Sequence, residues 1–400
     1  MINVKNNFTL ACHWAFPKDQ GGIGMHNLYL VNMLHKHFNI SVISSSNEIN
    51  EKYYSEKRIA FKGFKLSYPK IFLETMSKGI LNRGFRSIND LLVSYRISNI
   101  LNEDNPDVVE FIDIHSNSYL YLKNDKNRCK TKIIIRSHTP WSLLRNYYKP
   151  HEIKKTDTWL AMSRENYCFK NCDHITVPSN DLKERLIDIF NISQDKIKVL
   201  PNILDTKHFF PFERNNDASF TILHIGRLER AKGIETLVKA FIKLASVHKN
   251  IKLVVIGEAR GNSKVECINW LIKAGLINRV TFTGFVKYEK LPNYYANSDI
   301  VVVSSEIYES FSYTVAQGMA CGKPVIASNI GGIPETLDYG NAGLLFEPGN
   351  VDDLFSSIEQ LYFDSSLRNY YGKRARKYAL NNFSFKALEN RYSRFYNSLL

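Results

Sequence analysis

The feature that most constrains the fold of this chain is the regular alternation of short apolar runs with segments of helical periodicity. In the first half, strand patterns occur at residues 8–14, 40–44, 108–113, 132–136, 175–178 and 197–200. Helical patterns at 28–35, 88–101, 159–171 and 180–190 separate several of them. Such alternation predicts a parallel sheet with helices on both faces.

The second half repeats the scheme more clearly. Its strand patterns are almost continuously apolar, as expected of buried parallel strands, and occur at 220–225, 253–256, 280–283, 300–303, 325–327 and 343–346. Helical patterns lie at 234–248, 265–274, 291–297, 313–321 and 351–361. The polar, turn-rich stretch 211–217 separates the halves. We therefore expect an α/β protein with two Rossmann-like, doubly wound domains at 1–210 and 218–380, and a C-terminal helix in 381–400 that crosses back to the first domain.

Composition is typical of a soluble globular protein, because 44% of the 400 residues are apolar and 23% are charged. No apolar run approaches the roughly 20 residues of a membrane span, and the N-terminus lacks the features of a signal peptide. The six cysteines are scattered, which favours free thiols in a reducing cytoplasm. Cys168, Cys172 and His174 lie close together, but their spacing matches no common zinc pattern. We expect a cytoplasmic protein without a metal site.

The net charge of +14 is concentrated in residues 52–86, where nine basic residues face only Glu56 and Glu74. Phe, Tyr, Ile and Leu are interleaved with these basic residues, a combination that suits an anionic membrane surface or an acidic acceptor. We therefore assign Lys62, Lys65 and Lys70 to an acceptor or membrane surface. The alternative is a solvated basic surface around a small core. No motif for nucleic-acid binding accompanies the charge.

Ligands of doubly wound sheets bind at the carboxyl ends of the strands, so the segments after the strands are informative. The strand at 220–225 is followed by a basic turn, Gly226–Gly233, that contains Arg227 and Lys232. A planar guanidinium and an ammonium are a suitable pair for a diphosphate. An ordinary basic strand-to-helix turn is the competing interpretation.

An acidic loop and a helix of small residues follow the strand at 300–303. Glu309 comes just before the predicted helix start at Ser312, where it can accept hydrogen bonds from sugar hydroxyls. The N–H groups at the helix start are suited to a phosphate or sugar oxygen.

Several ordered motifs make the chain resemble the retaining family 4 glycosyltransferases of the GT-B fold. The family signature E-x-F-G-x-x-x-x-E-A-M-A-x-G-x-P-V-I-A-S reads here ESFSYTVAQGMACGKPVIAS. Other landmarks in order are GGIG, IIIRSHTP, VLPNILDTKHFFP, HIGRLERAKGIETLVKAF, VVIGE, FTGFV and GLLFEPGN. The resemblance covers nearly the whole chain and implies two Rossmann-like domains that face each other across a cleft.

Residue by residue, the resemblance implies a donor site in the second half and a catalytic histidine in the first. Arg227 and Lys232 would stabilise the leaving diphosphate, Glu309 would hold the donor sugar, and His138 would lie over the reacting sugar. A histidine satisfied inside a loop is the alternative for His138. The remaining donor-binding positions implied are Gly22, Gly24, Glu258, Phe285, Val286, Phe311, Ser312, Tyr313 and Gln317. The donor would be a UDP- or GDP-sugar, and no further cofactor is implied.

Two departures from the family pattern lie in the donor site. Gln317 stands where the family has a glutamate that binds ribose hydroxyls, and Ser312 stands where it has glycine. We expect weaker or altered nucleotide binding from the first change. The second narrows the space around the donor or caps the helix.

The implied reaction is metal-independent transfer with retention, in which the acceptor attacks the face that the nucleotide leaves. No metal-binding D-x-D lies in a suitable loop, and loss of activity on EDTA treatment would count against metal independence. The composition, rich in Lys, Asn and Ile, suggests an AT-rich bacterial genome. The family resemblance implies cell-surface polysaccharide synthesis at the inner face of the membrane, with a glycan or lipid-linked acceptor. Two alternatives stay open: a sugar-nucleotide epimerase of the same fold, and a non-catalytic partner of another transferase.

Overall fold

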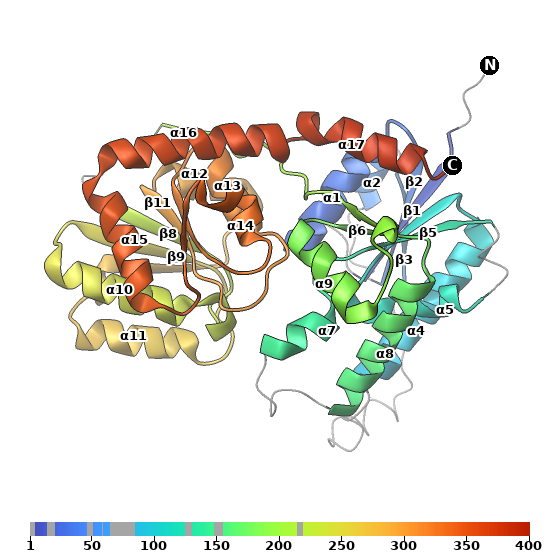
Figure 1. Cartoon of the computed structure of the whole chain (residues 1–400), viewed down its shortest axis with the longest axis horizontal. Coiled ribbons are helices and arrows are strands. Elements are labelled where there is room, and N and C mark those ends of the chain that lie inside the picture. Colours follow the sequence, from blue (N-terminus) through green and yellow to red (C-terminus); the bar gives the residue numbers. More distant parts are fainter. Residues whose placement is uncertain are drawn as a thin grey trace. The chain divides into compact units, whose positions relative to one another are not determined.

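The computed structural model describes residues 5–13, 21–45, 51–57, 59–64, 85–124, 130–147, 155–213 and 219–400. The chain forms two compact units, one of Met1–Asn202 with Glu389–Leu400 and one of Ile203–Leu388. Each unit has a parallel sheet with helices packed against it (Figure 1). The expected fold class, two doubly wound α/β domains, is confirmed.

The sheet of the first unit has the spatial order β3-β2-β1-β4-β5-β6-β7 within the described residues. In chain order its strands are β1 (Asn7–Cys12), β2 (Asn39–Ser44), β3 (Ala60–Gly63), β4 (Val108–Ile112), β5 (Lys132–Arg136), β6 (His174–Val177) and β7 (Ile197–Val199). The helices of this unit are α1 (Gly22–Leu34), α2 (Glu51–Glu56), α4 (Phe85–Asp104), α5 (Tyr119–Leu122), α7 (Trp141–Leu144), α8 (Lys155–Asn171) and α9 (Asn180–Phe190). All strand pairs are parallel.

The sheet of the second unit has the order β10-β9-β8-β11-β12-β13. Its strands are β8 (Phe220–Ile225), β9 (Ile251–Ile256), β10 (Val280–Gly284), β11 (Ile300–Val303), β12 (Val325–Ser328) and β13 (Leu344–Phe346). Its helices are α10 (Ile234–Val247), α11 (Ser263–Lys273), α12 (Leu291–Ala296), α13 (Tyr313–Ala320), α14 (Ile333–Thr336), α15 (Val351–Phe363) and α16 (Ser365–Asn382).

Two apolar cores lie on opposite faces of the second sheet, because successive residues of a strand point to opposite faces. Ile300 and Val302 of β11 belong to the core formed with α10, α11 and α15. Val301 and Val303 belong to the core formed with α12, α13, α14 and α16. Burial on both faces explains why the strands of this half read as continuous apolar runs.

The last helix, α17 (Phe385–Asn397), packs onto the first unit from Glu389 onward. Tyr392 donates a hydrogen bond to the carbonyl of Pro201 (2.9 Å), and Tyr396 donates one to Glu110 in β4. The side chains of Glu110, Tyr392 and Tyr396 are all buried. The end of the chain is therefore held by a buried polar contact as well as by packing.

The unit boundary and several elements differ from the expectations, since the short helices α2, α5, α7 and α14 were not expected and neither were β3 and α16. The second unit begins at Ile203, not after 210, because Leu204 and Phe209 are buried in its core and the amide of Leu204 donates to the carbonyl of Phe383 (2.8 Å). Residues 214–217 of the expected linker lie outside the described residues. Strand β3 was not expected, since it is a short edge strand with little burial. Helix α16 was also not expected, because the residues it buries are small: Gly372, Ala375 and Ala379.

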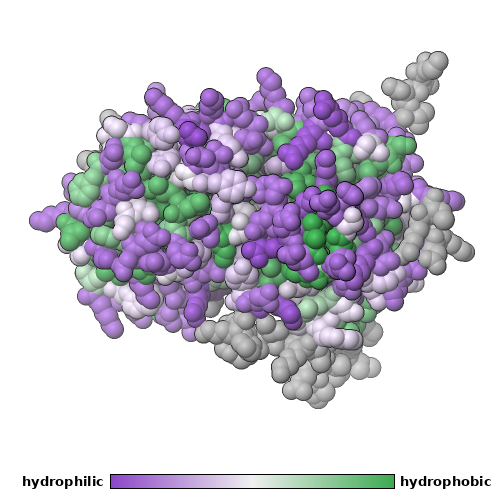
Figure 2. Space-filling view, viewed as in Figure 1, coloured by the Kyte–Doolittle hydropathy of each residue, from purple (hydrophilic) through white to green (hydrophobic). Residues whose placement is uncertain are grey.

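No helix within the described ranges has both the length and the apolar character that crossing a bilayer requires. The face of the protein shown in Figure 2 is mostly hydrophilic, with apolar side chains in scattered groups.

Candidate functional site: a basic turn and a glutamate at the carboxyl ends of β8 and β11

The strand order reverses between β8 and β11, which are neighbours in the second sheet although they are far apart in the sequence. Chain segments that leave the carboxyl ends of two such strands diverge, and the crevice between them is the usual ligand site of doubly wound sheets. The basic turn Gly226–Gly233 follows β8, and the loop that contains Glu309 follows β11. The two motifs singled out in the sequence are thus brought together.

The basic turn is pressed against the end of β11. Gly233 has a φ of 66°, and a Cβ atom there would lie 1.6 Å from the carbonyl oxygen of Ser304. The hydroxyl of Ser304 donates to the carbonyls of Lys232 (3.1 Å) and Gly233 (2.9 Å). Only glycine fits this position, and the resulting close contact fixes the backbone that carries Lys232.

The Lys232 ammonium and the Glu309 carboxylate form an ion pair of 2.8 Å. Ser305 donates a further hydrogen bond to the same carboxylate oxygen. Burial alone would raise the pKa of Glu309, but the charge and hydrogen bond of Lys232, with the hydroxyls of Ser305 and Ser312, outweigh it and lower this pKa. Glu309 is therefore an anion held in one orientation. Arg227, by contrast, is exposed and pairs with Glu229 at 2.9 Å.

Helix α13 begins beside Glu309. Ser312 is its N-cap residue in an extended conformation, and no side-chain cap bond is made. The hydroxyl of Tyr313 donates to the carbonyl of Ile203 (3.2 Å), and the ring of Phe311 packs edge-on against Phe383. The side chains of Phe311 and Tyr313 are thus used for contacts within the second unit.

Gln317 is almost completely buried, and its amide oxygen accepts a hydrogen bond from the hydroxyl of Tyr295 (2.9 Å). Tyr295 is fully buried in the core on the α12–α13 face of the sheet. One of the two lone pairs of this oxygen is therefore occupied within the protein. A ligand next to Gln317 would meet its amide N–H group.

Three other positions that the sequence resemblance assigns to donor binding lie at the carboxyl ends of neighbouring strands. Glu258 follows β9, is exposed, and its backbone carbonyl accepts from the amide of Leu228 (2.8 Å). Phe285, 57% exposed, and Val286, packed on the core, follow β10.

In the first unit, His138 follows β5 and is buried. Its amide donates to Asp113 (3.1 Å), which also accepts from the hydroxyl of Ser137 (2.7 Å). Burial and the nearby Arg136 hold the pKa of His138 well below its usual range, so its ring is neutral. The ring packs against that of His26 at 5.0 Å, and its Nε2 atom has no partner among the described residues.

Asp113 was not singled out in the sequence, where it was expected only to end a strand. Burial raises its pKa to about 6, against the opposing effects of Ser137, of the backbone amides and of Arg136. His224 in β8 was also missed: it is buried beneath Gly226, and burial lowers its pKa to about 4. A polar residue at or near the carboxyl end of a central strand was the available signal for both.

Gly22 and Gly24, which the resemblance assigns to donor binding, both lie in the first turn of α1, whose N-cap is Gly21. The helix starts earlier than the apolar pattern indicates because the glycines of its first turn have no side chains that could contribute to such a pattern. Residues 14–20, which precede it, lie outside the described residues.

Of the three lysines assigned to an acceptor or membrane surface, Lys65 and Lys70 lie outside the described residues. Lys62 is on the edge strand β3 and forms an ion pair with Asp104. Its charge is therefore partly compensated within the protein.

The described part of the chain contains no group of three or more His, Cys, Asp or Glu side chains arranged to hold a metal ion. Cys168 and Cys172 are buried free thiols, and burial raises the pKa of each to about 12.

Two family models match the chain. Residues 205–378 match "Glycosyl transferases group 1", and residues 20–208 match "Glycosyltransferase Family 4". Among curated proteins, an uncharacterized glycosyltransferase of Methanocaldococcus jannaschii is 32% identical over 54% of this chain and 57% of its own length. A D-inositol 3-phosphate glycosyltransferase of Paenarthrobacter aurescens is 29% identical over 49% of this chain and 50% of its own. The match thus spans little more than half of these relatives.

Solved structures with the same fold match almost end to end. A sucrose-phosphate synthase of Thermosynechococcus elongatus has a TM-score of 0.79 at 20% identity, covering 99% of both chains. Alr3699/HepE of Anabaena, solved in complex with UDP-glucose, has a TM-score of 0.76 at 17% identity, covering 98% of this chain and 100% of its own. The two family matches overlap at residues 205–208 and together extend from residue 20 to residue 378, so the chain belongs to the group 1 and family 4 glycosyltransferases of the GT-B fold.

Proposed function

We propose that the protein transfers a sugar from a nucleotide sugar to a glycan or lipid-linked acceptor with retention of anomeric configuration. The observation that carries the proposal is the ion pair of Lys232 with Glu309 at the carboxyl ends of β8 and β11. It places a cation for the diphosphate next to an anion for the sugar hydroxyls, which is the pair of charges that a nucleotide sugar requires.

The roles that we propose for the site residues are those that the family resemblance implies. Lys232 and Arg227 stabilise the departing diphosphate, and Glu309 orients the sugar by accepting hydroxyl hydrogen bonds. The neutral ring of His138 accepts a hydrogen bond from the reacting sugar, and Asp113 positions it through the backbone amide. No step in this scheme uses a metal ion. A role in bacterial cell-surface polysaccharide synthesis fits the family and the composition.

Binding across a panel of nucleotides and nucleotide sugars tests the proposal. Solved relatives were crystallised with UDP and with UDP-glucose, so these two ligands head the panel, and GDP and GDP-mannose follow. We expect one diphosphate to raise the thermal unfolding temperature and its sugar to be transferred once an acceptor is present. Epimer formation without an acceptor would favour the epimerase, and no binding to any member would favour the non-catalytic partner.

Replacing Gln317 by Glu is expected to tighten nucleotide binding about tenfold. Tyr295 can hold one carboxylate oxygen as it now holds the amide oxygen, and the second oxygen becomes a charged acceptor for ribose hydroxyls. Calorimetry with the selected nucleotide measures the change. Gln360→Glu, on the exposed face of α15, is the control for added charge. Equal affinity of the wild type and Gln317→Glu would show that this side chain does not contact the nucleotide.

A further inference from the structure

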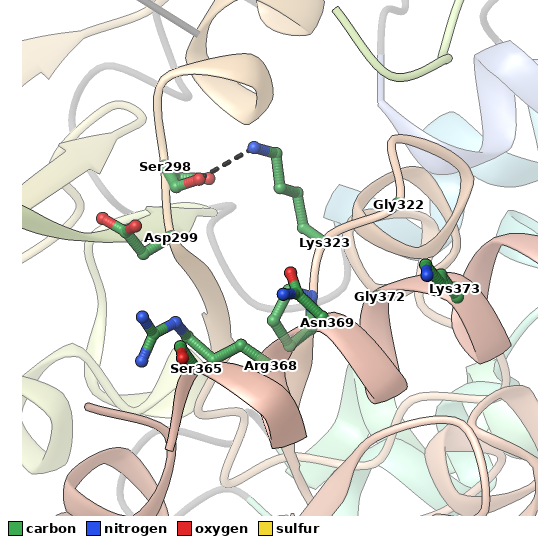
Figure 3. A pocket seen from close by; sticks show the side chains of 10 residues that line it. Ser298, Asp299, Gly322, Lys323, Ser365, Arg368, Asn369, Gly372 and Lys373 are labelled. Atoms are coloured by element: carbon green, nitrogen blue, oxygen red, sulfur yellow. Dashed lines mark hydrogen bonds between the residues drawn. The ribbon is translucent and has the colours of Figure 1, made fainter. Parts of the chain in front are cut away.

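The buried ring of His224 in β8 has one nitrogen atom that the protein itself does not use. Lys323, in the pocket drawn in Figure 3, shows the usual arrangement, since its ammonium donates to the carbonyls of Ala296 (2.8 Å) and Ser298 (2.9 Å). By contrast, Nε2 of His224 has no hydrogen-bond partner among the described residues. Buried polar atoms without a partner are rare, because an unmet hydrogen bond costs free energy.

The other ring nitrogen fixes the tautomer of His224. Nδ1 lies 3.1 Å from the carbonyl oxygen of Val302 in β11. A carbonyl oxygen can only accept, so Nδ1 carries the hydrogen. Burial, assisted by the charge of Lys232, lowers the pKa of the ring to about 4, although Val302 and Glu309 act in the opposite direction. The ring is therefore neutral at neutral pH, and Nε2 is a hydrogen-bond acceptor.

Gly226 leaves space directly beside Nε2. A Cβ atom on this glycine would lie 3.3 Å from Nε2 and 3.8 Å from Cε1 of His224. Apart from the chain neighbours of Gly226, no other atom of the described residues would lie within 4 Å of it. The φ of Gly226 is outside the left-handed region, so the backbone does not require glycine, and the missing side chain is what keeps this space open. Gly226 is itself partly exposed, which places the space near the surface of the basic turn.

The surroundings of the ring belong to the candidate site. The bond from Nδ1 to Val302 joins β8 to β11, the two strands between which the strand order reverses. Lys232 and Glu309, which form the ion pair of 2.8 Å, both lie close enough to shift the pKa of His224. An unused acceptor thus lies close to the two charges to which we assign the diphosphate and the sugar.

We propose, on the basis of the function proposed above, that Nε2 of His224 accepts a hydrogen bond from a hydroxyl group of the nucleotide sugar. A nitrogen without a hydrogen requires a donor, and the hydroxyl groups of the sugar and of the ribose can donate. The diphosphate of a nucleotide sugar carries no hydrogen at neutral pH, so its oxygens would place lone pair against lone pair. His224 and the anion Glu309 then supply two acceptors for hydroxyl groups, and Lys232 supplies the charge for the diphosphate.

Two substitutions of His224 separate ligand binding from structural support. In His224→Asn the amide nitrogen can still donate to the carbonyl of Val302, but no atom remains at the place of Nε2. In His224→Gln the longer side chain brings an amide oxygen to that place and loses the bond to Val302. Calorimetry on the full chain measures the binding of UDP-glucose and UDP, or of GDP-mannose and GDP if these bind the wild type more tightly. We expect His224→Asn to weaken binding of the nucleotide sugar by about tenfold, and His224→Gln by no more than about threefold.

Gly226→Ala is the third variant, because its Cβ atom takes the space beside Nε2 while the ring of His224 is retained. It should weaken binding of the nucleotide sugar about as much as His224→Asn does. A loss for the nucleotide sugar alone would assign the hydroxyl to the transferred sugar, and an equal loss for the nucleoside diphosphate would assign it to the ribose. Either result supports the proposal.

A purely structural role of His224 predicts that His224→Gln is impaired more than His224→Asn, since only the latter keeps the bond to Val302. That order, or unchanged affinity in His224→Asn or in Gly226→Ala, would overturn the proposal while the wild type still binds the nucleotide sugar. If the wild type bound no nucleotide sugar, the proposed function would be wrong and this role of His224 with it. Calorimetry in Pipes and in Tris, which differ in ionisation enthalpy, provides a further check. Proton uptake on binding that disappears in His224→Asn would mean that a protonated ring donates to a phosphate oxygen, which would also overturn the proposal.

Discussion

Replacing Lys232 by Met is expected to lower kcat/KM for the nucleotide sugar by about 10²- to 10³-fold, the usual effect of removing one group that stabilises developing charge. The ammonium of Lys232 lies 2.8 Å from Glu309, so its loss acts twice. The diphosphate loses a cation, and the buried carboxylate loses the group that keeps it ionised. Initial rates with the donor selected by the binding panel measure the effect.

The pH dependence of the remaining activity reveals the second part of this effect. In the wild type, Lys232 and the hydroxyl donors hold the pKa of Glu309 down against the effect of burial. Without Lys232, burial dominates and this pKa rises, so Glu309 takes up a proton at a higher pH than before. We expect the residual activity of Lys232→Met to fall more steeply on acidification than that of the wild type.

Arg230→Met is the matched control for Lys232→Met. Arg230 lies in the same turn, two residues before Lys232, and its side chain is exposed. Removal of its charge should change kcat/KM only slightly. Similar losses in the two variants would mean that the turn supplies a diffuse positive field and that the ion pair with Glu309 has no specific role.

The sequence could predict that the basic turn and the loop at Glu309 lie at the same edge of one sheet because that information is local. Strand β8 and the glycines of the turn after it are adjacent in the chain, and so are β11 and the loop at Glu309. The rule that ligands bind where parallel strands end then selects both segments. Each strand is also marked by a local apolar run, which is why the predicted ends of nearly all strands lie within a few residues of the observed ones.

Contacts between distant residues could not be predicted in this way. Nothing near Gln317 indicates that Tyr295 uses its amide oxygen, because the two residues are joined only by the packing of α12 against α13. Asp113 was overlooked for the same reason, since its partners Ser137 and His138 follow another strand. Helix α16 has only a weak apolar pattern, because close packing on Gly322 requires small residues where an amphipathic helix normally has large ones.

The ionisation of Glu110 is a further consequence of packing between distant segments. This carboxyl is buried in β4 between Arg136 of β5 and the tyrosines of α17. Burial raises its pKa from 4.5 to about 7, although the hydrogen bond from Tyr396 and the charge of Arg136 act in the opposite direction. The folded protein therefore keeps Glu110 protonated over a pH range in which the unfolded chain ionises it.

Replacing Glu110 by Gln is accordingly expected to stabilise the first unit at pH 8 and to leave it nearly unchanged at pH 4. Because the pKa of Glu110 is higher in the folded protein than in the unfolded chain, its protonated carboxyl contributes its full stability below about pH 4.5. This contribution is lost as the pH rises through about 7, the pKa in the folded protein. At about 1.4 kcal/mol per pKa unit, the loss amounts to about 3 kcal/mol. Glutamine keeps an oxygen for Tyr396 but cannot ionise, so the variant avoids this loss.

Thermal unfolding of the variant and the wild type at a series of pH values measures the difference. Other buried groups also titrate in this range: the pKa values of Asp113 and Glu165 are raised, and those of His26 and His138 are lowered. Their effects on the unfolding temperature are common to the variant and the wild type, so they cancel to first order in the comparison. Glu389→Gln changes an exposed carboxyl of α17 that lies 3.7 Å from Lys36, and it should show no comparable gain at pH 8. If Glu110→Gln were no more stable than the wild type at pH 8, Glu110 would already be stabilised as an anion by Arg136. Tyr396 of α17 would then donate its hydrogen bond to a carboxylate anion, and replacement by glutamine would weaken that bond.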